Sequence, residues 1–183
     1  MKISTQYGDV TVVDEPTYAF GSADNVRSYA HAKNLYAGSR PVSVHGILLD
    51  DAPLLVVGGS GGATGVHSHS ALWLNDRLYM AVCDSVVCIS IQPLEILWSR
   101  RVDDATCFGV HFHPETGSLI SHGELEVARF NEGGAIQWRS GGHDIFTGRF
   151  SLGATFIEAE DFCGNLHRFL YTNGKDPACA DVA

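Results

Sequence analysis

The sequence lacks the features that mark membrane and secreted proteins. Nowhere in its 183 residues is there an apolar run of about 18 residues, the length that a membrane-spanning helix needs. Its first residues contain no apolar segment of the kind found in signal peptides. The five cysteines are odd in number and irregularly spaced, which disfavours a disulfide framework. We therefore expect a soluble, cytoplasmic protein with reduced thiols.

Positive charge is scarce. The chain has 12 lysine and arginine residues against 21 aspartate and glutamate residues, which gives a formal net charge of −9. An acidic surface repels phosphate backbones and anionic lipids, so neither nucleic acid nor a membrane is an expected partner. A basic protein or a metal ion would be attracted to it. Acidity also serves simply to keep a protein soluble.

No segment matches a catalytic or nucleotide-binding motif. One glycine-rich segment is present, and it consists of Gly58, Gly59, Ser60, Gly61 and Gly62. Such a loop binds phosphate when a helix follows it and a lysine completes the motif, but here a strand is expected to follow. The serine in this segment is not expected to form the nucleophile elbow of serine hydrolases, because that motif also needs a flanking helix. We interpret the segment as a long connection between strands that could contact a partner.

Short runs of β-branched and aromatic residues, separated by glycine, proline, asparagine and aspartate, fill most of the chain. This pattern is typical of antiparallel strands joined by tight turns. It predicts a mainly all-β protein, a meander of strands over residues 41–175 within a single domain of residues 1–183. A further hairpin is expected near the N-terminus, from Lys2–Tyr7 and Asp9–Val13. Residues 176–183 are small and polar, and we expect them to fray.

One short helix is expected within the N-terminal residues 1–40. Ser22 can act as its N-cap, so the helix would cover Ala23–Asn34. Val26, Tyr29 and Ala30 would then lie on one face and form a narrow apolar stripe. This helix would pack over one end of a sheet.

The strand pattern repeats. Trp98 and Trp138 lie 40 residues apart, and alignment on them places Tyr79 on Leu119 and Met80 on Ile120. A weaker third copy runs over 156–175. Four short strands in about 40 residues correspond to one blade of a β-propeller, which must stack on neighbouring blades to bury its faces. The sequence therefore predicts a propeller-like stack of four-stranded units.

The segment from Ala128 to Trp138 resembles the docking repeat of quinoprotein-type (PQQ-like) propellers, and the period is similar to that of WD-type repeats. In the quinoprotein repeat an alanine, a turn glycine and a tryptophan keep this spacing, and the tryptophan packs between blades. The resemblance implies that role for Trp98 and Trp138, and it carries over no quinone-binding residue. The copies are few for a closed ring, so an open array, a bent sheet array and a small ring all remain open.

Two His-x-His pairs are the most suggestive chemical feature. Both pairs fall in expected strands, where alternation would place the two members of a pair on one face. With the carboxylate that follows the second pair, they could hold zinc, iron or manganese. The candidate ligands are His67, His69, His111, His113 and Glu115. The structural alternative is that these histidines recur because they occupy repeated strand positions, each bonded to a turn.

These observations favour a non-enzymatic binding module over an enzyme. We expect a protein partner or self-association, and the acidity suits an inhibitor or immunity-type protein that neutralises a basic partner. No cofactor is expected in this case. The competing hypothesis is a metal-dependent enzyme that uses the two His-x-His pairs.

Overall fold

The computed structural model describes residues 1–177, and its regular elements are all β-strands. The strands are β1 (Lys2–Thr5), β2 (Gly8–Asp14), β3 (His31–Asn34), β4 (Ser43–Leu49), β5 (Ala52–Gly59), β6 (Ala71–Leu74), β7 (Arg77–Val82), β8 (Ser85–Ile91), β9 (Leu94–Arg101), β10 (Cys107–His113), β11 (Ser118–Gly123), β12 (Glu126–Phe130), β13 (Ile136–Gly141), β14 (Phe146–Leu152), β15 (Phe156–Asp161) and β16 (Leu166–Leu170). The expectation of a mainly all-β chain is confirmed. Within residues 1–177, no helix has the length and apolarity needed to cross a membrane. The expected fraying of 176–183 falls mostly outside the described residues.

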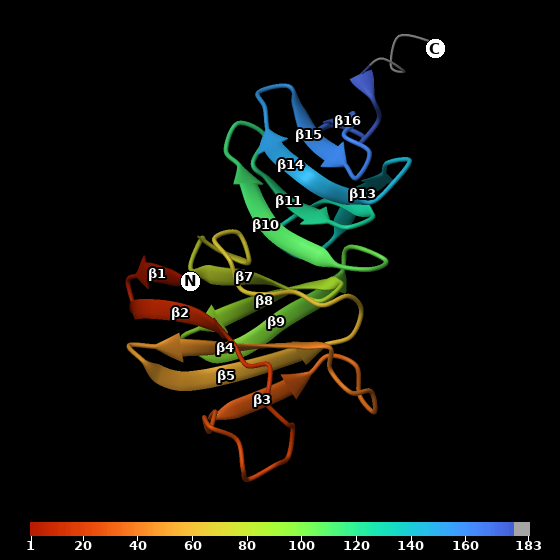
Figure 1. The fold of residues 1–183 in the computed structure, drawn as a ribbon. Coiled ribbons are helices and arrows are strands. Elements are labelled where there is room, and N and C mark those ends of the chain that lie inside the picture. Colours follow the sequence, from red (N-terminus) through yellow and green to blue (C-terminus); the bar gives the residue numbers. More distant parts are fainter. Residues whose placement is uncertain (178–183) are drawn as a thin grey trace.

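The strands form four sheets that follow one another along the molecule (Figure 1). The first sheet has the order β1-β2-β4-β5-β3, the second β6-β7-β8-β9, the third β10-β11-β12-β13 and the fourth β14-β15-β16. The second and third sheets are four-stranded antiparallel meanders, as a propeller blade requires. In the first sheet, β3 adds to the outer edge parallel to β5. The fold is therefore propeller-like, an array of blade-like sheets.

A separate apolar layer lies between each pair of successive sheets. Leu78 and Met80 belong to the layer between the first and second sheets, whereas Tyr79 belongs to the layer between the second and third. Ile120 belongs to the next layer, between the third and fourth sheets. Tyr79 is thus the structural counterpart of Ile120, 41 residues later, and not of Leu119. A shift of one residue moves a side chain to the opposite face of its strand. The constant period of 40 was therefore wrong by one residue for these strands.

The difference in spacing is absorbed between the third and fourth strands of the blade. Cys88 pairs with Trp98 in the second sheet, and Arg129 pairs with Trp138 in the third. The same register shift follows Cys88 and Arg129, so the difference lies in the turn, which is one residue longer between Ile89 and Ile96 than between Phe130 and Ile136. The fourth strands therefore keep the period of 40 that the tryptophans indicate, while the second and third strands are offset by 41.

The two tryptophans occupy equivalent places between blades, as the resemblance to the quinoprotein repeat implied. The indole N–H of Trp98 donates to the Glu132 carbonyl at 2.9 Å, and that of Trp138 donates to the Tyr171 carbonyl at 2.8 Å. Each ring lies directly over a turn glycine of the following sheet, at Gly134 and Gly174 respectively. Both glycines have positive φ, where a side chain would be strained as well as too close to the indole.

The helix expected at Ala23–Asn34 does not form. Residues 23–30 are irregular, and 31–34 form β3. The reason is a long-range contact: Arg27 and Tyr29 both donate to the buried carboxylate of Glu15, each at 2.6 Å. Residues two apart point to different sides of a helix, so an extended backbone satisfies this contact and a helix does not. The proposed apolar stripe is not buried either, since Val26 is 91% exposed.

The two outward faces of the array are covered in different ways. On the first sheet, Phe20 lies against Gly58 and Tyr29 against Gly46, so the segment of residues 15–30 forms a lid over this face. On the fourth sheet, Arg168 and Arg149 both pair with Glu158. Terminal units of stacked arrays need such polar or covered outer faces. The described sheets therefore form an open array whose first end is covered by the lid and whose last end carries ion-paired side chains.

Candidate functional site

Four histidines gather between the second, third and fourth sheets. They come from the turn before β6 and from β10 and β11, and they are His67, His69, His111 and His122. The rings of His69 and His111 lie 4.7 Å apart. His67 and His69 lie in a turn region and not in a strand as expected, because β6 begins only at Ala71. The alternation argument therefore does not apply to the first His-x-His pair.

Hydrogen bonds within the protein occupy both ring nitrogens of His67. Its Nε2 donates to the Phe108 carbonyl at 2.7 Å, and its Nδ1 accepts the backbone N–H of His69 at 3.2 Å. The imidazole joins the second sheet to the third and has no lone pair left for a metal ion.

His111 and His122 both pack against Phe150 of the fourth sheet. The ring of His122 stacks on Phe150 at 4.2 Å, and the ring of His111 lies 4.7 Å from it. The Nε2 atoms of the two histidines are buried and have no hydrogen-bond partner in the described structure. Burial, together with the neighbouring histidines, lowers the pKa of His111 to about 3 and that of His122 to about 4. Both rings are therefore neutral at neutral pH.

The second His-x-His pair does not act as a unit. His113 stacks on Tyr171 at 4.2 Å, and its Nδ1 lies 3.0 Å from the Thr116 hydroxyl. Glu115 is in the exposed turn between β10 and β11. Across residues 1–177, no group of three or more histidine, cysteine, aspartate or glutamate side chains is arranged to hold a metal ion. The geometry thus gives no support to the metal-dependent enzyme.

The glycine-rich segment packs against the protein along most of its length. Gly58 and Gly59 are buried at the end of β5, and the Ser60 hydroxyl lies 2.9 Å from that of Ser39. The backbone N–H of Gly62 donates to the Ala105 carbonyl at 2.8 Å, in the connection between the second and third sheets. Only the region around Gly61 is exposed. A role in contacting a partner stays a prediction for this loop.

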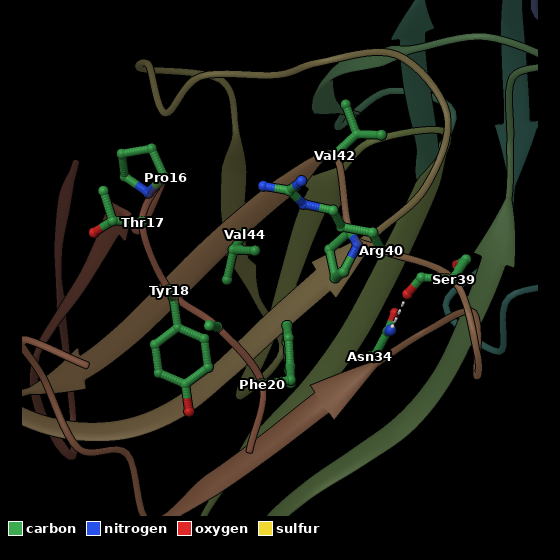
Figure 2. A pocket seen from close by; sticks show the side chains of 11 residues that line it. Pro16, Thr17, Tyr18, Phe20, Asn34, Ser39, Arg40, Val42 and Val44 are labelled. Carbon is green, nitrogen blue, oxygen red and sulfur yellow. Dashed lines mark hydrogen bonds between the residues drawn. The ribbon is translucent and has the colours of Figure 1, made fainter. Parts of the chain in front are cut away.

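A trough lies on the outward face of the first sheet, beside the lid. Its main part has a volume of about 600 Å³ and lies between residues 16–20 of the lid and residues 39–44. Figure 2 shows the guanidinium of Arg40 between Pro16 and Val42. A neighbouring depression of about 340 Å³ shares Pro16, Val42 and Val44 with it and reaches Asp14. We use the name trough for these two joined depressions.

The walls of the trough are held in place by aromatic and backbone contacts. The ring of Tyr18 packs edge-on against Phe20 at 5.2 Å and against Tyr29 at 5.8 Å. On the opposite wall, the backbone N–H of Val42 donates to the Gly59 carbonyl at 2.8 Å. Val44, on the outward face of β4, is buried between the walls. Among residues 1–177, Val44 belongs to none of the apolar layers between sheets.

The trough could not be predicted from the sequence, because the residues that line it are distant in the chain and one of its walls is the lid. Residues 14–20 and 39–44 meet only because β2 pairs with β4. The available signal was composition: a proline follows the acidic pair that ends at Glu15, and Pro41 follows Arg40. Prolines of this kind fix loops next to strands, but they do not show that two such loops lie together.

No family model matches the chain, and no curated protein is similar to it. Among solved structures it is similar to the crystal structure of BamB from Moraxella catarrhalis, with 13% sequence identity and a TM-score of 0.31. The match covers 76% of this chain and 59% of that chain. This chain thus spans less than two thirds of the length of that protein.

Proposed function

We propose that this chain is a non-enzymatic binding module that holds a protein partner in the trough on its first sheet. The observation that carries the proposal is a preformed, solvent-open depression of about 600 Å³ that is not used in packing between sheets. Its volume is in the range of ligand-binding sites, and exposed proline, valine and aromatic side chains are typical of surfaces that bind protein segments.

The charge of the chain favours a basic protein as the partner. The net charge is −9, and several turns carry exposed carboxylates that make no ion pair within residues 1–177. These carboxylates are Asp51, Asp76 and Glu115. Such a field speeds the encounter with a positively charged protein, while the trough provides the specific contact. An inhibitor or immunity-type role against a basic partner fits this arrangement, and we propose it as the finer function.

The test is capture from a lysate of the source organism with the immobilised wild-type chain and two variants. Val42→Trp places a large ring in the trough at a side chain that is 53% exposed. Val26→Trp makes the same change at a side chain that is 91% exposed and does not line the trough. We expect one protein with a basic isoelectric point to be retained by the wild type and by Val26→Trp, and to be lost with Val42→Trp.

Two outcomes would contradict the proposal. One is equal retention of every captured protein by the Val42→Trp variant, which would place binding elsewhere. The other is the absence of any protein retained above the background of an unrelated acidic protein. If the wild type captures a neutral or acidic protein and Val42→Trp loses it, the trough is a protein-binding site but its partner is not a basic protein.

A further inference from the structure

The loop that carries Arg40 is fixed by hydrogen bonds on both sides. The Asn34 amide donates to the Ser39 carbonyl at 2.9 Å, and the backbone N–H of Ser39 donates to the Tyr36 carbonyl at 3.2 Å. The Ser39 hydroxyl also lies 2.9 Å from the Ser60 hydroxyl. Pro41 restricts the backbone of the residue before it to extended conformations. The position from which Arg40 projects is therefore set before any ligand arrives.

The guanidinium of Arg40 makes no hydrogen bond or ion pair in the described part of the chain. The carboxylate of Glu15, which precedes Pro16 in the lid, accepts its hydrogen bonds from Arg27 and Tyr29. The Arg40 side chain is exposed, so its N–H donors are open to a ligand. A guanidinium presents paired N–H donors that match a carboxylate, so this part of the trough is complementary to an anion.

Asp14 lines the neighbouring depression and adds a charge of opposite sign to the trough. Its carboxylate accepts the backbone N–H of Val66 and lies 3.2 Å from the His45 imidazole, yet its side chain is still 44% exposed. Val42 and Val44 line both depressions, so an apolar surface adjoins both charges. Two joined depressions with opposite charges suit an extended chain better than a compact molecule.

We propose that the trough recognises an extended peptide segment through an aspartate or glutamate side chain that pairs with Arg40. A small apolar residue or proline of the segment lies next to this acid, against Val42 and Val44, and the chain continues toward Asp14. The inference rests on the proposed function, since it names the side chain of the partner that the trough binds. A partner of basic overall charge satisfies it when the segment that enters the trough contains one acidic residue.

The experiment uses a random heptapeptide library displayed on phage, selected against the full chain and two charge-reversal variants. Arg40→Glu reverses the charge in the trough. Lys33→Glu makes the same change in net charge on β3, outside the trough. We expect peptides enriched in aspartate and glutamate from the wild type and from Lys33→Glu, and peptides enriched in lysine and arginine from Arg40→Glu.

The leading peptide from the wild type is then synthesised and its affinity measured by calorimetry. Arg40→Ala should weaken its binding about tenfold, the effect of losing one charge-assisted contact at a partly exposed site. Replacing the acidic residue of the peptide by its amide should weaken binding to the wild type by a similar factor and leave binding to Arg40→Ala nearly unchanged.

Three outcomes would overturn the inference: no enriched peptide, enrichment without an acidic residue, or the same acidic preference in Arg40→Glu. The proposed function fails separately. If Val42→Trp abolishes capture of the partner while Arg40→Glu leaves the peptide preference unchanged, the trough binds a protein but does not recognise an acidic side chain. If Val42→Trp has no effect on capture, the binding site itself is elsewhere.

Discussion

Lowering the pH from 7 to 5 should destabilise the contact between the third and fourth sheets. His111 and His122 face Phe150 across this contact, and their buried Nε2 atoms have no partner in the described structure. A proton added to either ring would place a charge in an apolar layer next to two further histidines, His67 and His69. The unfolded chain accepts the same proton in water without this penalty.

The sign and the size follow from the pKa values. An unfolded histidine has a pKa of about 6.5, whereas His111 has a folded pKa of about 3 and His122 of about 4. The folded values are depressed, so the stability contribution is complete above pH 6.5 and is lost as the pH falls toward 4. At pH 5, about 1.5 units below the unfolded value, each group has lost about 2 kcal/mol. Both together remove about 4 kcal/mol, a large part of the stability of an ordinary domain.

Urea unfolding followed by tryptophan fluorescence at pH 7, 6 and 5 measures this loss directly. The variants His111→Phe and His122→Phe keep a ring against Phe150, and each should lower the slope of stability against pH by about 1.4 kcal/mol per unit. His31→Phe, at an exposed histidine of β3, should leave the slope unchanged. Equal stability of the wild type at pH 7 and pH 5, or an unchanged slope in both buried-site variants, would refute the reasoning.

Two other substitutions test how the sheets are joined. Gly134→Ala should destabilise the protein by about 2–4 kcal/mol in urea unfolding, because the new Cβ would lie 2.7 Å from the Trp98 ring. Gly38→Ala, at a similar positive φ with no atom within 4 Å, should lose only about 1 kcal/mol, and equal losses at both sites would contradict the docking role of the tryptophan. Asp103→Ala should lower stability by about 3–5 kcal/mol, since this fully buried carboxylate accepts four backbone N–H groups between the second and third sheets. A melting temperature within 2 °C of the wild type (about 1 kcal/mol or less) would show that water replaces those bonds.

The strands could be predicted from sequence because each one carries its own signal. Short apolar runs and the turns between them are local, and the runs at Cys107–His113 and Glu126–Phe130 coincide with β10 and β12. The period of the tryptophans was also visible. The bulges after Cys88 and Arg129 were not, because a bulge changes pairing between strands without leaving a mark in composition.

The errors came from contacts between distant segments. The stripe of Val26, Tyr29 and Ala30 has helical spacing, but Glu15 holds Arg27 and Tyr29 in an extended chain instead. The histidines of the first pair recur near strand positions, yet His67 sits in a turn where its ring bonds the neighbouring sheet. The trough needs both the lid and the pairing of β2 with β4. Single-sequence patterns contain none of these pairings.

The coverings at the two ends of the array determine where the protein could gain or lose a repeat. On the outward side of the fourth sheet, Glu158 and Arg168 stand where the third sheet presents Ile120 and Arg129 toward its neighbour. A fifth sheet added there would have to bury an ion pair. A duplicated third sheet inserted after the second would instead meet an apolar layer on each side and a turn glycine for every tryptophan. Lengthening by internal duplication therefore keeps every apolar layer matched, whereas a sheet packed on the fourth one covers the Glu158–Arg168 ion pair.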